Sequence, residues 1–200
     1  MSPTILFALC FAGYLLGSLP FAVIVSAAFG LADPRSYGSG NPGATNVLRS
    51  GNKLAAALTL IGDAAKGWLA VWLALQLVSD PAAAALVGLA AFVGHVFPVF
   101  LKFKGGKGVA TALGVLLGLS PPLALGAALC WLAVAALFRY SSLAAIVTAI
   151  AVSIAAWIWL GEARSAACIN TLCAILIWRH EANIRKLLAG TEGRIGQKKA

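Results

Sequence analysis

The stretch that decides the fold is residues 109–138, which read VATALGVLLGLSPPLALGAALCWLAVAALF. It carries no charge and covers 30 residues, whereas a single helix needs about 20 apolar residues to cross a bilayer. Pro121 and Pro122 stand near its middle, after Gly118 and Ser120. Because proline lacks an N–H and clashes with the preceding turn, a straight helix is unfavourable there. The stretch therefore predicts either one long kinked span or two short helices, at 109–119 and 123–138.

The rest of the chain has the composition of a membrane protein. Of its 200 residues, 61% are hydrophobic and 10% are charged, whereas soluble domains are about a quarter charged. Further apolar runs cover residues 5–30, 54–78, 82–101, 141–160 and 165–178. We therefore expect an all-α, polytopic membrane helix bundle that forms one domain over residues 1–200. The first run is too long for the apolar part of a signal peptide and is expected to be a span.

The basic residues favour two crossings by the 109–138 stretch. The net charge of +9 would suggest nucleic acid on a soluble protein, but here we interpret it as a topology signal and expect no nucleic-acid partner. With seven crossings, the polar segments 32–53, 102–108, 139–141 and 179–200 share one side of the membrane. That side then holds 13 of the 15 basic residues. The positive-inside rule places it in the cytoplasm and the N-terminus outside.

The first loop, residues 32–53, is dense in groups that suit phosphate. It contains DPRSYGSGNPGATNVLRSG at residues 33–51. Glycines permit close approach of the backbone, so consecutive N–H groups can form an anion-binding nest. An arginine such as Arg49 can donate to two phosphate oxygens at once. An ordinary polar turn is the alternative interpretation.

The second loop, residues 102–108, combines lysines with glycines just before an apolar run. It reads KFKGGKG and resembles half of a P-loop, but it lacks the full nucleotide-binding pattern. A loop of this kind that opens a helix places N–H groups and ammonium ions where an anion would bind. A positive-inside anchor is the plainer alternative. His95, near the end of the preceding run, suits either packing or catalysis.

The tail and the second apolar run add further polar groups. If the last span continues as a helix, His180 and Asn183 share one of its faces and are suited to orient a hydroxyl or a phosphate. An interfacial belt of Trp, Arg and His is the alternative. Asp63 and Lys66, also three residues apart, are expected to form an ion pair that supports the site from behind.

Several kinds of chemistry lack their residue patterns. There is no carboxylate cluster for Mg²⁺ or Zn²⁺, no G-x-S-x-G and no H-E-x-x-H. We therefore expect neither a metal nor a cofactor. The four cysteines lie within apolar runs and are expected to be small buried side chains.

Taken in order along the chain, the motifs resemble those of one family. They are GSLP at residues 17–20, GSGNPGATN at 38–46 with Arg49, GH at 94–95 with FPV at 97–99, KGGKGVAT at 104–111, and WRH at 178–180 with Asn183. Together they resemble the bacterial acyl-phosphate:glycerol-3-phosphate acyltransferases, over nearly the whole chain.

This resemblance implies a seven-span enzyme of the bacterial inner membrane, with its active site facing the cytoplasm. It implies acyl transfer from acyl phosphate to the 1-hydroxyl of glycerol 3-phosphate, which gives lysophosphatidic acid and phosphate in the first step of phospholipid synthesis. The catalytic candidates are Ser39, Arg49, Lys107, His180 and Asn183. The candidates for binding substrate phosphate are Gly38, Gly40, Asn41, Gly43, Thr45, Asn46, Lys104, Gly105, Gly106, Gly108 and Ser142. The supporting candidates are Asp63, Lys66, His95 and Arg179.

The chemistry of the donor suggests what such a site must do. An acyl phosphate is a mixed anhydride with a good leaving group, so positioning and charge stabilisation can supply most of the acceleration. Either His180 or a substrate phosphate oxygen takes the hydroxyl proton. A transporter for phosphate esters is the competing hypothesis, although transporters usually place their sites near the membrane midplane. The lipid bilayer is the expected surrounding, and the oligomeric state stays open.

Overall fold

The computed structural model describes residues 2–196, and every regular element among them is a helix. The longer helices are α1 (Pro3–Gly17), α4 (Lys53–Leu77), α5 (Pro81–Val96), α6 (Val109–Leu119), α7 (Pro121–Phe138), α8 (Ser141–Trp159) and α9 (Ala163–Arg179). The shorter ones are α2 (Phe21–Ala28), α3 (Ala44–Val47), α10 (Glu181–Leu188) and the 3₁₀ turns η1 (Leu48–Ser50) and η2 (Val99–Leu101). The expectation of an all-α membrane protein is confirmed.

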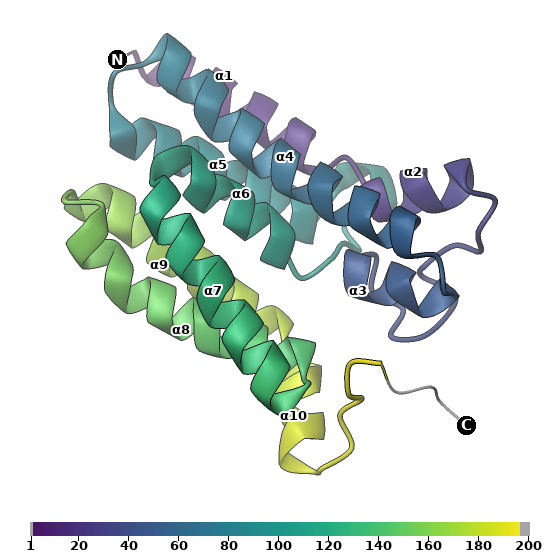
Figure 1. Cartoon of the computed structure of the whole chain (residues 1–200). Coiled ribbons are helices and arrows are strands. Elements are labelled where there is room, and N and C mark those ends of the chain that lie inside the picture. Colours follow the sequence, from purple (N-terminus) through teal and green to yellow (C-terminus); the bar gives the residue numbers. More distant parts are fainter. Residues whose placement is uncertain (1, 197–200) are drawn as a thin grey trace.

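The 109–138 stretch forms two helices, as one of the two alternatives predicted. α6 ends at Leu119, Ser120 is extended, and α7 begins at Pro121. Proline is well accommodated at the first position of a helix, because its missing N–H has no partner there in any case. In Figure 1 the α6–α7 turn lies toward the same end of the molecule as the N-terminus, and α7 runs from there toward α10. The chain thus turns back at Ser120.

Within residues 2–196, five segments are long and apolar enough to cross a membrane. They are Pro3–Ala28, Lys53–Leu77, Pro81–Leu101, Pro121–Phe138 and Ser141–Trp159. The first is divided between α1 and α2 by a break at residues 18–20, which the apolar pattern of the 5–30 run does not reveal. At 11 and 17 residues, α6 and α9 fall short of a standard span.

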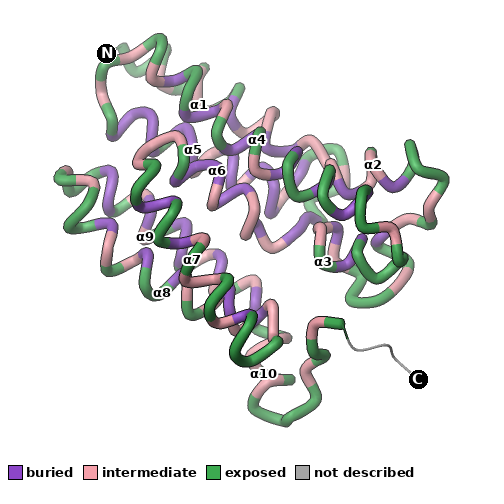
Figure 2. The backbone as a smooth tube through the Cα atoms, viewed as in Figure 1, coloured by how far each residue is buried: buried purple, intermediate pink, exposed green. Residues whose placement is uncertain are grey.

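Glycines let the central helices approach closely. A Cβ on Gly114 of α6 would overlap the carbonyl oxygen of Ala64 in α4, and one on Gly17 of α1 would overlap that of Ala91 in α5. Small residues of this kind are typical of helix contacts inside membranes. In Figure 2 the buried positions concentrate along the inward faces of α5, α6 and α9, while the outer faces of α7 and α8 are exposed.

Candidate active site

The first loop is held in shape by the side chain of Asn46. Its amide nitrogen donates to the carbonyls of Pro34 (2.6 Å) and Tyr37 (3.1 Å), and its oxygen accepts from the N–H of Ser39 at 3.0 Å. Asn46 is only 2% exposed. Every strong bonding group of this amide is therefore used by the loop itself, so Asn46 is placed to shape the loop rather than to contact a ligand.

Several other residues of the first loop remain open to solvent. Gly38 and Gly40 have φ angles of 62° and 68°, a left-handed conformation that favours glycine. The side chains of Ser39, Thr45 and Arg49 are exposed, and Asn41 and Gly43 are half-buried. Arg49 also lies 3.4 Å from the oxygen of Asn46 through Nη1. This loop therefore presents hydroxyls and one guanidinium on a fixed backbone.

The second loop is seated on the end of α5. The N–H of Gly105 donates to the carbonyl of Val96 and that of Gly106 to the carbonyl of His95, both at 3.2 Å. Gly108, with a φ of 85°, then leads into α6. The N-terminus of α6 opens next to Lys107 and supplies the N–H groups and dipole that favour an anion. The side chain of Lys104 is exposed.

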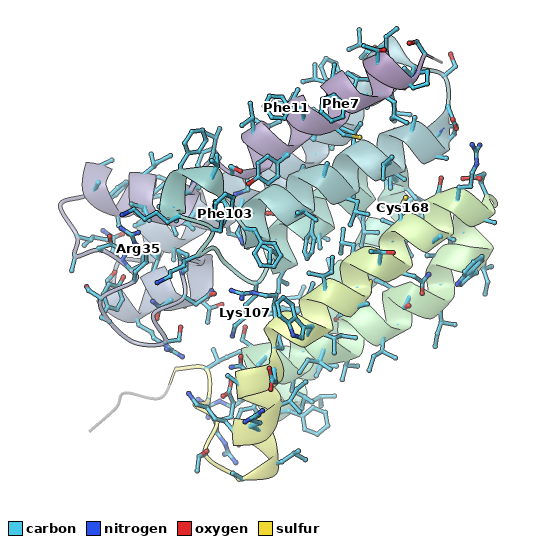
Figure 3. All side chains as sticks on the ribbon, turned by 180° about the vertical axis from the view of Figure 1, so that it is seen from behind. Phe7, Phe11, Arg35, Phe103, Lys107 and Cys168 are labelled. Atoms are coloured by element: carbon cyan, nitrogen blue, oxygen red, sulfur yellow. The ribbon has the colours of Figure 1, made fainter. Side chains whose placement is uncertain are left out.

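A chain of hydrogen bonds joins the second loop, the tail and α8. Lys107 Nζ donates to Asn183 Oδ1, and Asn183 Nδ2 donates to Glu192 Oε1 at 2.6 Å. The same carboxylate oxygen accepts from Ser142 Oγ at 2.6 Å. Figure 3 shows Lys107 of the second loop beside the C-terminal helices. Residues on the two sides of the α6–α7 hairpin thus meet at one end of the molecule.

The first loop and the tail reach the same place. Thr45 Oγ1 lies 3.4 Å from Ser141 Oγ, next to Ser142. Arg179 donates through Nη2 to the carbonyl of Gly105 at 3.2 Å. The structure therefore brings together the first loop, the second loop, the α7–α8 link and the tail, the segments that the distribution of basic residues placed on one side.

The charge of Lys107 is finely balanced in this setting. Burial lowers the pKa of Lys107 to about 8, Glu192 opposes that shift, and the cations of Arg179, Arg49 and Lys186 add to it. The ammonium form therefore still predominates at neutral pH, but it is held with excess positive charge nearby. Such a group gains from binding an anion.

His180 lies at a junction rather than within a continuous helix. α9 ends at Arg179 and α10 begins at Glu181, so the condition that one helix runs through the tail is not met. The imidazole is 2% exposed, and its Nδ1 lies 2.8 Å from the carbonyl of Leu176. A carbonyl can only accept, so Nδ1 carries the proton and Nε2 is an acceptor. Burial lowers the pKa of His180 to about 4, and the ring is neutral near pH 7.

Asp63, Lys66 and His95 form a cluster beneath the second loop. Lys66 Nζ lies 2.7 Å from Asp63 Oδ1, which confirms the expected ion pair. His95 Nδ1 lies 3.4 Å from the same oxygen. All three residues are buried.

Glu192 is the member of this site that the sequence motifs did not reveal. It is half-buried in the GTEGR stretch of the tail at residues 190–194 and accepts from both Asn183 and Ser142. A weak signal was available, because Glu192 is one of only three acids, with Asp33 and Glu181, among the basic residues on the positively charged side of the chain. The length and folding of the tail that carry it to α8 leave no local pattern.

Helices long and apolar enough to span a membrane, with polar loops gathered at one end, are those of an integral membrane protein. A family model described as glycerol-3-phosphate acyltransferase matches residues 7–190. The chain belongs to this family.

The relatives cover the chain almost completely. A protein named glycerol-3-phosphate acyltransferase from Aromatoleum aromaticum is 60% identical over 192 residues, which are 96% of this chain and 98% of that protein. Another with the same name, from Laribacter hongkongensis, is 64% identical over 190 residues, which are 93% and 94% of the two chains.

Two crystal structures share the fold as well. Both are of PlsY (YgiH), described as an integral membrane glycerol 3-phosphate acyltransferase. Its glycerol 3-phosphate form superposes with a TM-score of 0.90 at 38% identity and covers 96% of each chain. The lysophosphatidic acid form gives a TM-score of 0.89, also at 38% identity, and covers 96% of this chain and 95% of that one.

Proposed function

We propose that this protein transfers an acyl chain from acyl phosphate to the 1-hydroxyl of glycerol 3-phosphate and releases lysophosphatidic acid and inorganic phosphate. The observation that carries the proposal is the hydrogen-bonded chain from Lys107 through Asn183 and Glu192 to Ser142. Arg179, Arg49 and Lys186 also lie close enough to act on the charge of Lys107, so cationic groups outnumber the carboxylate of Glu192 at this end of the bundle. The names of the relatives state glycerol 3-phosphate as the substrate and give no acyl donor. Acyl phosphate as the donor is therefore part of this proposal.

The excess of positive charge is what two anionic substrates require. Two phosphate groups repel each other, and Arg49 and Lys107 would offset that repulsion while they orient the phosphates. Ser39, Thr45 and residues 38–40 are exposed beside them and would complete the phosphate contacts. Asn46 would act by fixing the loop, and Glu192 by orienting Asn183 and Ser142.

The transfer itself needs no covalent enzyme intermediate. The hydroxyl oxygen of glycerol 3-phosphate forms a bond to the acyl carbon, and the bond from that carbon to the phosphate oxygen breaks. The hydroxyl proton passes to His180 Nε2 or to a phosphate oxygen of a substrate. The neutral ring of His180, with Nδ1 fixed on Leu176, has the correct tautomer to accept it.

The proposal includes the topology of the chain. We assign seven crossings, with α6 and α7 as a hairpin, the N-terminus outside, and the site on the cytoplasmic face of a bacterial inner membrane. The bonds that link Lys107, before the hairpin, to Ser142, after it, support an even number of crossings between them. Labelling of single cysteines placed at Lys53 and Gly161 in intact cells and inverted vesicles tests this. The two must be reached from opposite sides.

Phosphate release tests the activity. Purified protein in detergent is given palmitoyl phosphate and glycerol 3-phosphate, and phosphate and lysophosphatidic acid are measured in equal amounts. Palmitoyl-CoA and palmitoyl-acyl carrier protein replace the donor in parallel reactions. Transfer from a thioester but not from the acyl phosphate would overturn the assigned donor. Counterflow of glycerol 3-phosphate in vesicles without any transfer would favour transport instead.

The histidine variant separates the two routes for the proton. His180→Asn removes Nε2 while it retains an amide that can donate to Leu176. A loss of about 100-fold in kcat, with a changed pH profile, is expected if His180 is the base. A near-normal rate with the wild-type profile assigns the proton to a substrate phosphate.

A further inference from the structure

Three ionisable side chains are buried together beneath the second loop. Asp63, Lys66 and His95 are 2%, 3% and 7% exposed. Asp63 Oδ1 lies 2.7 Å from Lys66 Nζ and 3.4 Å from His95 Nδ1. Ionisable groups inside membrane spans are costly and are usually retained for a function. Its ion pairs and hydrogen bonds join its own members and the carbonyl of Leu19, so it is suited to support the site.

The imidazole of His95 is the part of this cluster that contacts the loop. A Cβ on Gly106 would overlap Nε2 of His95 and would also lie 3.1 Å from the carbonyl oxygen of Pro42 in the first loop. Gly106 is therefore enclosed between the imidazole ring and the first loop. The position of the ring along α5 sets how closely the two loops approach.

The opposite end of the cluster contacts the break between α1 and α2. Lys66 Nζ donates to the carbonyl of Leu19 at 2.8 Å. Leu19 lies just before α2, which leads directly into the first loop. One ion pair on α4 thus holds both the imidazole below the second loop and the segment from which the first loop departs.

We propose that His95 is a positioning residue, held by Asp63 and Lys66, whose imidazole sets the position of Gly106 and through it the register of the two phosphate loops. The inference rests on the proposed function and adds a determinant that touches neither substrate. Displacement of reacting groups by about 1 Å can cost about 100-fold in rate. A contact that fixes the position of the loop should therefore have a measurable effect on the rate.

The test is a double-mutant cycle between the ring and the glycine. Gly106→Ala, His95→Ala and the double variant are compared with wild type by kcat/KM for glycerol 3-phosphate. In the wild-type background, Gly106→Ala is expected to lower kcat/KM about 100-fold, because the new methyl group displaces the loop. In the His95→Ala background the same change is expected to cost less than about 5-fold, because the overlapping ring is gone.

Gly105 provides the matched control. A Cβ on Gly105 would overlap the carbonyl oxygen of His95 and come within 2.6 Å of that of Val96, and both are backbone atoms that His95→Ala retains. Gly105→Ala should therefore lose the same activity with or without the imidazole. Equal losses of kcat/KM for Gly106→Ala in both backgrounds would overturn the proposal. Recovery of activity in Gly105→Ala when His95→Ala is added would overturn it as well.

Two further measurements keep the result independent of folding and of the assigned reaction. If His95→Ala is not monodisperse, His95→Asn replaces it, because the shorter amide can face Asp63 and lacks the Nε2 edge. The increase in melting temperature caused by glycerol 3-phosphate is recorded for all variants. Wild type without phosphate release would contradict the proposed function. Absence of coupling between His95 and Gly106 in the ligand-induced increase would contradict this inference.

Asp63→Asn tests the support of the ring. It is expected to raise the KM for glycerol 3-phosphate about 10-fold and to move kcat less, because the loop is loosened rather than removed. Ser153→Ala, which removes a hydroxyl bonded to Asn170 between α8 and α9, is the control and should leave KM unchanged. An unchanged KM in folded Asp63→Asn protein would show that the ion pair does not hold the ring for binding.

Discussion

Two polar clusters in this molecule differ in how their charges are balanced. In the buried cluster, the carboxylate of Asp63 faces Lys66 and His95, and no member is exposed. In the site cluster, the single carboxylate of Glu192 lies among Lys107, Arg179, Arg49 and Lys186, and much of it is open to solvent. The first cluster is internally paired and can only hold its neighbours in place. The second has unmatched positive charge, which a bound phosphate would match.

Removal of one partner from the buried pair should produce the largest effect. Lys66→Met leaves the buried carboxylate of Asp63 without its ammonium partner, with only His95 facing it, and is expected to lower the free energy of unfolding by about 3–5 kcal/mol. The double variant Asp63→Leu/Lys66→Met should recover much of that loss, because no charge remains buried. Thermal unfolding in detergent measures both. If the double variant is no more stable than the single one, the two side chains must stabilise the fold by contacts other than their mutual charge neutralisation.

Removal of a cation from the site should instead reduce activity and spare the fold. Arg49→Ala and Lys107→Ala are each expected to lower kcat/KM about 100- to 1,000-fold, since each deletes a charge that would face a phosphate. Lys53→Ala, an exposed lysine at the start of α4, is the control and should retain near-normal activity. A fall in melting temperature as large as that of Lys66→Met would erase the distinction between the two clusters.

The pH dependence should report the balance around Lys107. Activity that needs its ammonium group is expected to fall as the pH rises through about 8. Glu192 raises the pKa of Lys107, so Glu192→Gln should move this fall to lower pH, which a profile of kcat/KM measures. Glu181→Gln, at an exposed pair with Arg185, should leave it in place.

The shifted pKa of Lys107 should also make the stability of the protein depend on pH. The folded pKa of about 8 lies below the ordinary value of 10.5, so the unfolded chain binds more protons between them. The free energy of unfolding should therefore rise with pH across that window, opposite to the activity. If activity and the free energy of unfolding instead fell together as the pH rises, general alkaline damage would be the explanation.

The smallest effect is expected at the contact between the first loop and α8. Thr45 Oγ1 and Ser141 Oγ are 3.4 Å apart and exposed to solvent. Thr45→Val removes this hydrogen bond and one hydroxyl of the loop, with an expected loss of about 2- to 10-fold in kcat/KM. A loss as large as that of Arg49→Ala would place Thr45 in direct contact with the reacting atoms.

Much of this arrangement could be predicted from local sequence. Prolines at 121 and 122 gave the end of α6 at Leu119, because proline effects act within one turn of the chain. The pair of Asp63 and Lys66 followed from helical spacing alone. The polar loops could be grouped at one surface because a membrane leaves few alternatives for basic residues.

Other features depend on how helices rotate and pack. His95 joins Asp63 only because α4 and α5 present those two faces to each other, and no spacing in one helix encodes that contact. Asn46 could be read as a ligand for phosphate from its residue type, yet its amide serves the loop. Glu192 reaches Ser142 across 50 residues through the fold of the tail.

The shortness of α6 has a consequence for how the chain enters the membrane. Eleven residues make a helix of about 16 Å, roughly half of a hydrocarbon core of about 30 Å. We expect a segment of that length to insert poorly into the membrane by itself during synthesis. Packing of α6 against α4, where Gly114 lies against Ala64, would then hold it in the membrane. The second loop leads directly into α6, so we expect it to reach its working position only after α6 has packed against α4, which is made earlier.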